Sequence, residues 1–324
     1  MQTVSKTLIT DFATPPMDIE EAILKPLGSE LALSPDKTED GLAARVGDAD
    51  YIITQFAPVT AKVIGAMKKA RLIVRYGIGV DNVDLKAAAA KGIPVCNVPD
   101  YCIDEVADHT LALILAATRQ VVPCANVIKA GQWKLPVPLT ALHALKHMTV
   151  GIVALGRIGR EVVNRLKPFK CRLVAFDPAL SADKVRAAGC EPVTLDELYA
   201  QSDLITLHCP STEQTKHMIN AGSIARMKKG VIFVNASRGT LCRTPDLIAA
   251  LRSGHISAAA LDVCDPEPIE TDSPLLKMDN VVITSHIASV SPQAVKKLRE
   301  DVARAVARRI QGEPLVNVVN GVVA

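Results

Sequence analysis

The chain has 324 residues, of which 49% are hydrophobic, 22% charged and only 3% aromatic. This composition excludes a disordered or fibrous chain, and the length allows two domains with ample cores. The formal net charge is only +3 and the basic residues are scattered, so we expect no nucleic-acid partner.

The eight cysteines are spread singly along the chain, with no CxxC pair and no spacing typical of metal ligands. They predict thiols in a reducing compartment, and therefore a cytoplasmic protein without a metal site. Residues 1–11 contain one lysine and too short an apolar run for a signal peptide. Since no apolar stretch is long enough to span a bilayer, we expect no membrane association.

In the first hundred residues, short runs rich in Val and Ile alternate with Ala-rich segments of helical period. Strands are predicted at residues 7–10, 51–54, 72–75 and 94–96, and helices at residues 60–69 and 85–91. This alternation predicts a parallel sheet with helices on both faces.

A long helix over residues 103–118 and a loop over residues 133–145 come next. A second series of strands then follows, at residues 149–154, 172–176, 204–208, 231–235, 258–262 and 281–284. Six strands at this spacing are what a complete dinucleotide-binding sheet requires. The last predicted helix covers residues 292–311, before Gly312 and Pro314.

Residues 150–160 have the pattern of a strand, a turn and a helix that binds a dinucleotide phosphate. The pattern is GxGxxG with Ala154 in place of the first glycine. Gly156 lets the backbone approach a pyrophosphate at the helix N-terminus, and Gly159 lets the helix pack close to the strand. Alanine adds only a methyl group, which residue 154 tolerates if its φ is negative.

Asp177 ends the next predicted strand, at the offset of about 20 residues expected for a carboxylate that binds ribose. The residues after it are Pro178, Ala179 and Leu180, with no arginine among them. A carboxylate at this position repels a 2′-phosphate, so the sequence favours NAD over NADP. The alternative for Asp177 is an ordinary turn aspartate.

Later strand ends carry the groups that reduction of a carbonyl needs. Arg238, Asp262 and His286 each stand at or just after the carboxyl end of a predicted strand, where open α/β sheets bind ligands. Glu267 lies on the loop beyond Asp262. An arginine binds a carboxylate through two parallel N–H bonds, and a carboxylate beside a histidine stabilises its charged form and fixes its tautomer. Each residue alone has a structural explanation, but together they indicate hydride transfer at C2 of a 2-oxo or 2-hydroxy acid.

With these residues the chain resembles the D-isomer-specific 2-hydroxyacid dehydrogenase family over nearly its whole length. The matching segments are residues 74–84, the phosphate loop, residues 202–210, 235–239 and 262–268, and His286. The resemblance implies two doubly wound, Rossmann-like α/β domains. A flavodoxin-like substrate domain would comprise residues 1–101 and 291–324, with the NAD domain, residues 102–290, inserted in it. It also implies a homodimer formed through the NAD domains.

By position, the resemblance makes Arg238 a substrate-binding residue, His286 the acid/base, and Glu267 the carboxylate that supports His286. The backbone of Ile78, Gly79 and Val80 would hold the substrate carboxylate with Arg238. Arg75 would lie at the substrate, or else pair with a structural acid. The residues implied to line NAD are Gly156, Arg157, Ile158, Asp177, Cys209, Pro210, Thr215, Ala236 and Asp262.

Besides Ala154, two positions depart from the family pattern. Arg243 stands where an aspartate is usual, and Ser285 where a proline usually precedes the histidine. The branches most similar to this chain are phosphoglycerate dehydrogenases and C-terminal-binding proteins. We therefore expect an NAD-dependent reductase of small 2-oxo acids such as glyoxylate or hydroxypyruvate. The alternatives are a 3-phosphoglycerate dehydrogenase and an NAD(H)-sensing co-repressor. Because the chain ends at Ala324, we expect no regulatory C-terminal domain.

Overall fold

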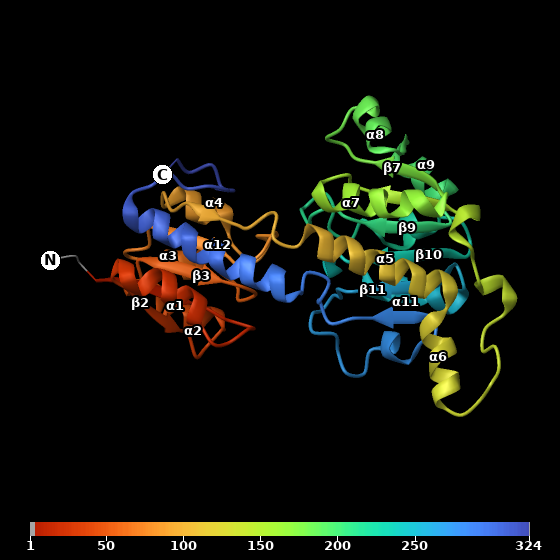
Figure 1. Cartoon of the computed structure of the whole chain (residues 1–324), viewed down its shortest axis with the longest axis horizontal. Coiled ribbons are helices and arrows are strands. Elements are labelled where there is room, and N and C mark those ends of the chain that lie inside the picture. Colours follow the sequence, from red (N-terminus) through yellow and green to blue (C-terminus); the bar gives the residue numbers. More distant parts are fainter. Residues whose placement is uncertain (1–3, 324) are drawn as a thin grey trace. The chain divides into compact units, whose positions relative to one another are not determined.

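The computed structural model describes residues 4–323, so residues 1–3 and 324 of the predicted substrate domain lie outside it. The chain divides into two compact units. The first unit combines the residues up to Tyr101 with those from Ser291 onward, and the second is Cys102–Val290. Each unit is an α/β sandwich around one parallel sheet (Figure 1).

The first unit has a five-stranded sheet in the order β2-β1-β3-β4-β5. This order is the flavodoxin-like one, as expected. Two of the predicted strands match to the residue, and β2 is an additional edge strand that the sequence pattern missed. The strands are β1 (Ser5–Ile9), β2 (Ser29–Leu33), β3 (Tyr51–Thr54), β4 (Leu72–Arg75) and β5 (Val95–Cys96).

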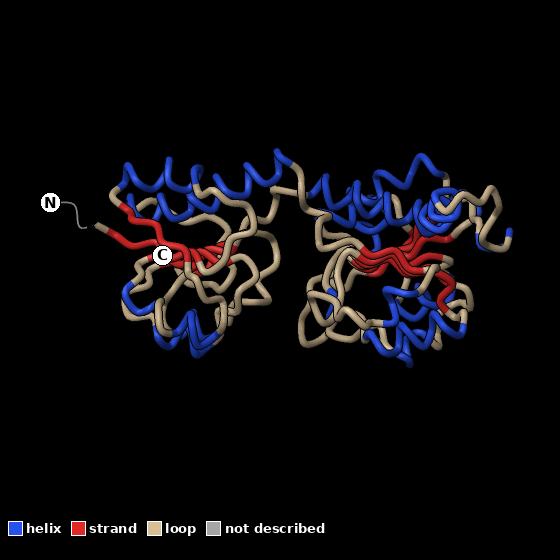
Figure 2. The backbone as a smooth tube through the Cα atoms, turned by 90° about the horizontal axis from the view of Figure 1, so that it is seen from below, coloured by secondary structure: helices blue, strands red, loops and turns tan. Residues whose placement is uncertain are grey.

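Helices cover both faces of this sheet (Figure 2). The helices are α1 (Asp18–Leu24), α2 (Glu39–Ala43), α3 (Ala61–Ala66), α4 (Leu85–Ala90) and α12 (Pro292–Gln311). Along β3, Tyr51 and Ile53 join the core shared with α12, whereas Ile52 joins the core under α2 and α3. Successive strand residues point to opposite faces, so a fully apolar strand supplies both cores.

The second unit has a seven-stranded sheet in the order β12-β11-β10-β9-β6-β7-β8. All of its pairings are parallel, and the order reverses between β6 and β9, which is the switch point of a Rossmann sheet. It contains the six predicted strands and one more, the two-residue β8. The strands are β6 (Thr149–Val153), β7 (Arg172–Phe176), β8 (Glu191–Pro192), β9 (Leu204–Leu207), β10 (Val231–Asn235), β11 (Ile256–Leu261) and β12 (Val281–Ile283).

Two helix layers enclose this sheet as well. The helices are α5 (Ile103–Arg119), α6 (Val121–Lys129), α7 (Arg157–Leu166), α8 (Ala182–Ala188), α9 (Leu195–Gln201), α10 (Ala221–Ile224) and α11 (Thr244–Ser253). α5 packs on α7 and on β10, β11 and β12. Among the described residues, no single helix meets the length and hydropathy of a membrane span, although α5 and α6 do so jointly across a 67° bend.

Candidate active site

The phosphate loop lies at the switch point, between β6 and the N-terminus of α7. Ala154, directly after β6, has a φ of 73°. The condition of a negative φ at this alanine is therefore not met: the tight turn keeps the left-handed conformation that glycine favours, and alanine adopts it at a cost of about 1 kcal/mol. The Ala154 N–H donates to Phe176 O over 2.8 Å, which ties this turn to β7.

The two glycines of the loop meet different surroundings. A β-carbon at Gly156 would find no atom within 4 Å, and Gly156 caps α7 without a side-chain hydrogen bond. Gly156 thus offers no capping side chain to the first N–H groups of α7, and Gly156 and Arg157 are both exposed. At Gly159 a β-carbon would lie 2.2 Å from Ala154 O. This contact agrees with the packing role predicted for Gly159.

Asp177 follows β7 and lies against the phosphate loop. Its Oδ2 accepts a hydrogen bond from Leu155 N–H at 2.8 Å, and its Oδ1 accepts one from Ala179 N–H at 2.9 Å. The carboxylate is therefore fixed next to Ala154 and Gly156, and each oxygen keeps a lone pair for a further donor.

The loop after β9 reaches the same edge of the sheet. Cys209 is buried, and burial raises the pKa of its thiol to about 11, so the thiol stays protonated at neutral pH. Pro210 O accepts a hydrogen bond from Thr215 Oγ1 at 2.6 Å, which closes this loop into a turn. His208, just before Cys209, lies beside Gly159, and burial lowers the pKa of its imidazole to about 4.

Arg238 stands on the loop that leaves β10. Asn235 donates through Nδ2 to Arg238 O at 2.9 Å, and Ser237 donates through Oγ to Cys209 O at 2.6 Å. Ala236, between them, packs partly buried against the core. These bonds fix the backbone that carries Arg238 and attach it to the loop after β9.

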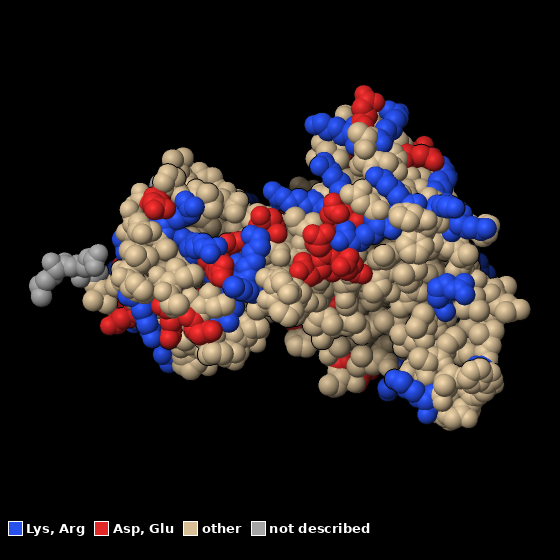
Figure 3. Space-filling view, viewed as in Figure 1, with Lys and Arg blue, Asp and Glu red and all other residues tan. Residues whose placement is uncertain are grey.

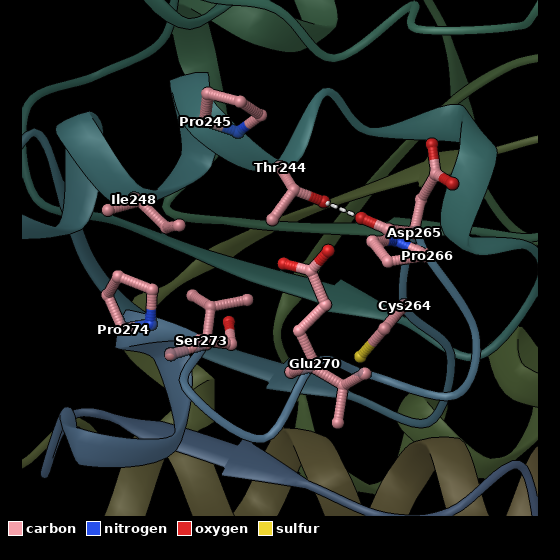
Figure 4. Close-up of a pocket in the computed structure, with 11 residues that line it drawn as sticks. Thr244, Pro245, Ile248, Cys264, Asp265, Pro266, Glu270, Ser273 and Pro274 are labelled. Carbon is pink, nitrogen blue, oxygen red and sulfur yellow. Dashed lines mark hydrogen bonds between the residues drawn. The ribbon is translucent and has the colours of Figure 1, made fainter.

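The loop of Arg238 also packs directly on the loop that carries Glu267. A β-carbon at Gly239 would lie 1.8 Å from Cys264 O, so only glycine allows the two backbones to approach this closely. Thr244 donates to Asp265 O at 2.6 Å and makes a second link. Figure 4 shows that link in a small pocket. Cys264, Asp265 and Pro266 line the pocket, whereas Arg238, Glu267 and His286 do not.

His286 and Glu267 form a direct pair, as the sequence predicts. His286 Nδ1 lies 2.6 Å from Glu267 Oε1. A carboxylate only accepts hydrogen bonds, so Nδ1 carries a proton that it donates to Glu267. The side chains are 26% and 39% exposed, so both reach solvent. His286 has a φ of 55°, and its N–H donates to Asp262 O at 2.8 Å.

Asp262 lies beneath this pair with a fully buried side chain. Its Oδ1 accepts from Thr284 Oγ1 at 2.5 Å and from Ile287 N–H at 3.0 Å, and its Oδ2 accepts from Ala288 N–H at 2.9 Å. Burial opposes its charge, but the hydrogen bonds from His109, Thr284 and the two amides outweigh burial and lower its pKa. Sequence reasoning proposed Asp262 only as a cofactor residue and missed that it holds the histidine loop.

The two remaining departures from the family pattern lie near these loops. Arg243 forms an ion pair with Asp246 at 2.9 Å, so its charge is balanced on the first turn of α11. Ser285 is exposed. Arg243 and Ser285 therefore lie near the loops of the histidine–glutamate pair, and neither departure removes a chemical group from that pair.

In the first unit, the other predicted site residues follow β4. Arg75 is buried, and a β-carbon at Gly77 would lie 1.6 Å from its Nη1, so the guanidinium packs directly on the loop that follows. Ile78, Gly79 and Val80 are partly exposed. Among the hydrogen bonds of residues 4–323, none is donated by the backbone N–H groups of these three residues.

The structure thus gathers at one sheet edge most of the site residues that the sequence predicts in the second unit. It adds three residues that the sequence reasoning did not propose: His109, Thr284 and His208. Thr284 directly precedes Ser285 and His286 at the end of β12, a position that could have suggested its role. His109 lies within α5 between two other polar residues, Asp108 and Thr110, so the sequence pattern did not single it out.

Comparison with known proteins identifies the family to which this NAD-binding sheet and its site residues belong. Residues 111–288 match the family model described as "D-isomer specific 2-hydroxyacid dehydrogenase, NAD binding domain". A glyoxylate reductase of Korarchaeum cryptofilum is 39% identical over 279 residues, which cover 85% of this chain and 84% of that protein. A D-3-phosphoglycerate dehydrogenase of Archaeoglobus fulgidus is 37% identical over 304 residues, 93% of this chain. The match spans only 57% of the latter protein's length.

Among solved structures, the D-lactate dehydrogenase of Aquifex aeolicus, in complex with NAD and lactic acid, superimposes with a TM-score of 0.84 at 28% identity. The superposition covers 95% of this chain and 96% of that one. The family model covers more than half of the chain, and its bounds fall within the second unit. The chain therefore belongs to the D-isomer specific 2-hydroxyacid dehydrogenase family, and its second unit contains the NAD-binding domain.

Proposed function

We propose that this protein is an NAD-dependent D-2-hydroxyacid dehydrogenase that works as a reductase of small 2-oxo acids. The observation that carries the proposal is the 2.6 Å contact between His286 Nδ1 and Glu267 Oε1, on loops at the carboxyl edge of the NAD-binding sheet. A histidine whose second nitrogen is held by a carboxylate is a general acid/base.

The second unit has the groups that NAD requires. The open N-terminus of α7 at Gly156 and Arg157 suits a pyrophosphate, and Ile158 packs behind it on the core. Asp177 suits the ribose hydroxyls, because each of its oxygens still has a lone pair to accept a donor. We place Cys209, Pro210, Thr215, Ala236 and Asp262 along the remainder of the cofactor. When bound, the reduced nicotinamide supplies the hydride.

The chain's own residues perform the rest of the reaction. His286, protonated on both nitrogens, donates the Nε2 proton to the ketone oxygen of the substrate as that oxygen becomes a hydroxyl. Glu267 accepts the Nδ1–H and stabilises the charged ring before the transfer. In the direction of oxidation, the neutral ring accepts the hydroxyl proton instead. Arg238 binds the substrate and polarises its carbonyl group.

We propose that the loop after β4 in the first unit binds the substrate carboxylate. The N–H groups of Ile78, Gly79 and Val80 donate to no other described residue, and successive free N–H groups make an anion-binding concavity. Arg75 packs on Gly77 in the same loop. The family resemblance led to these four residues, and the geometry of the loop supports them.

Glyoxylate and hydroxypyruvate are the substrates we favour, in keeping with the similarity to a glyoxylate reductase. The test is loss of NADH absorbance with glyoxylate, hydroxypyruvate, pyruvate, 2-oxobutyrate, 2-oxoisocaproate and phosphohydroxypyruvate. Turnover of the first two above the others supports the proposal. Preference for phosphohydroxypyruvate would indicate a 3-phosphoglycerate dehydrogenase instead. Tight NADH binding without turnover of any of them would favour an NAD(H) sensor.

We further propose a homodimer formed through the second unit. Large apolar side chains are exposed on α6 and the loop after it, including Trp133 at 94% and Leu139 at 77%. We call this set the apolar arm; its other members are Val121, Val122, Ile128 and Leu135. The surface around α6 in Figure 3 consists mainly of uncharged residues. Contiguous exposed apolar residues typically mark an interface, and a second copy of the chain offers a matching surface.

The location we propose is the cytoplasm. All eight cysteines are free thiols, and Cys96, Cys190, Cys209 and Cys242 are buried with raised pKa values. Chains that work in an oxidising compartment tend to use cysteines in disulfides. Fractionation of cells that express a fluorescent fusion of the protein tests this assignment, because the fluorescence should be recovered in the cytoplasmic fraction.

A further inference from the structure

His109 links α5 to the loop that carries His286. It projects from α5 toward the end of β12, with a side chain that is 21% exposed. Its Nε2 lies 3.0 Å from Thr284 Oγ1 and 3.5 Å from Asp262 Oδ1. The three side chains come from three separate elements of the second unit and meet at one carboxylate oxygen.

The direction of each hydrogen bond follows from the lowered pKa of Asp262. Because the Asp262 carboxylate is ionised, it accepts the Thr284 hydroxyl proton over 2.5 Å. Thr284 Oγ1 then has only lone pairs to offer, so His109 Nε2 must carry a proton and donate it. The same N–H group faces Asp262 Oδ1, so His109 orients both the hydroxyl and the carboxylate.

The oriented carboxylate in turn defines the backbone around His286. Asp262 accepts all three successive N–H groups of residues 286–288, through its carbonyl, Oδ1 and Oδ2, at 2.8, 3.0 and 2.9 Å. This turn holds His286 at a φ of 55°, a left-handed conformation that a residue other than glycine adopts at a cost of about 1 kcal/mol. Rotation of the Asp262 side chain would release two of the three bonds.

We propose that His109 is a positioning residue for His286. Through its Nε2–H it fixes Thr284 and Asp262, and these fix the turn that presents His286 to Glu267. The inference rests on the proposed acid/base role of His286. Misplacement of an acid/base group by about 1 Å costs up to about a hundredfold in rate. The contribution of His109 therefore appears in turnover more than in cofactor binding.

The test compares His109→Leu, which removes the donor, with His109→Gln, whose side-chain amide reaches the place of Nε2. We expect His109→Leu to lower kcat about tenfold or more while KM and the Kd for NADH stay within about twofold, and His109→Gln to recover most of kcat. The matched control is His255→Leu, which removes a histidine bonded to Met227 O elsewhere in this unit and should leave kcat unchanged.

A second measurement needs no substrate. Hydrogen exchange at the amides of Ile287 and Ala288 should speed up about tenfold in His109→Leu and return toward the wild-type rate in His109→Gln. If wild-type protein reduces no 2-oxo acid, the proposed function fails while this measurement still tests the positioning role. The inference would be overturned if His109→Leu kept the wild-type kcat and the wild-type exchange rates. It would also be overturned if His109→Leu and His109→Gln changed kcat and the exchange rates equally.

Thr284 provides an independent arm if His109→Leu does not fold. Thr284→Ser keeps the hydroxyl that bridges His109 and Asp262, whereas Thr284→Val removes it. We expect faster exchange at the same two amides and a lower kcat in Thr284→Val only. If Thr284→Val has the same kcat and the same exchange rates as Thr284→Ser, the hydrogen bonds from His109 through Thr284 do not hold the turn.

Discussion

Gly159 and Ala154 pack so closely that a β-carbon on the glycine would lie 2.2 Å from the alanine carbonyl oxygen. The contact joins the first turn of α7 to the turn after β6. Ala154 has a φ of 73°, and its carbonyl oxygen is the atom that such a β-carbon would meet first. The shape of the phosphate loop thus depends on both residues.

Substitutions in the loop should therefore separate stability from cofactor binding. Gly159→Ala should lower the free energy of unfolding by about 1–3 kcal/mol and weaken NADH binding, because the helix must move away from Ala154. Gly156→Ala, where the β-carbon meets no protein atom, should weaken NADH binding with little change in stability. Ala154→Gly should keep NADH binding and leave stability equal or up to about 1 kcal/mol higher. Urea unfolding and NADH fluorescence measure both quantities, and equal effects of the two glycine variants on stability would contradict this account.

His286→Asn should lower kcat by about a hundredfold to ten-thousandfold while the Kd for NADH stays unchanged, because the acid/base nitrogen is lost. Glu267→Gln should have a smaller effect, since the amide oxygen still accepts from His286 Nδ1 but no longer stabilises the charged ring. Steady-state kinetics and NADH fluorescence measure these changes. Near-normal turnover in His286→Asn would show that another group exchanges the proton.

Asp177 should determine the preference for NADH over NADPH. Asp177→Ala should weaken NADH binding about tenfold or more, because charge-assisted hydrogen bonds are lost, and should relax discrimination against NADPH. Asp177→Asn keeps an oxygen that can accept from Leu155 N–H, so it should relax discrimination with less damage to the loop. Kd values for both nucleotides test this prediction, and strong NADPH use by the wild type would contradict it.

The free energy of unfolding should fall in mild acid because of the buried His208. Burial lowers its pKa to about 4 in the folded protein, whereas an unfolded histidine titrates near 6.5. The unfolded state thus binds the proton first, and the stability that the neutral ring provides at pH 7 is lost as pH falls from about 6.5 to about 4. The loss reaches about 3 kcal/mol. His208→Gln should flatten this dependence in urea unfolding, whereas His147→Gln, which alters an exposed histidine, should leave it in place.

Replacing two residues of the apolar arm with charged ones should give monomers. We expect the double variant Trp133→Glu, Leu139→Glu to elute at half the wild-type mass in size-exclusion chromatography with light scattering. Val323→Glu alters an equally exposed apolar residue outside the arm and should leave the mass unchanged. A wild-type protein that is already monomeric at micromolar concentration would refute the homodimer.

Much of the fold was predictable because its strands are continuous apolar runs buried on both faces. The bounds of β3, β4, β7, β10 and α12 agree with the pattern to the residue. The segment between residues 11 and 50 gave no clear pattern, and it contains α1, β2 and α2. β2 and β8 lie at sheet edges, where half-exposed residues carry weaker periodicity.

The sequence by itself determined the order of the elements, the phosphate loop and the residues that follow each strand. Parallel strands bring their carboxyl ends to one edge, so the contact between Glu267 and His286 was predictable from their places in the chain. Only the tertiary structure decided the backbone of Ala154 and the link from His109 to Asp262. Both depend on contacts between segments that are distant in sequence. Local propensity depends only on residues close in sequence, so it cannot predict such contacts.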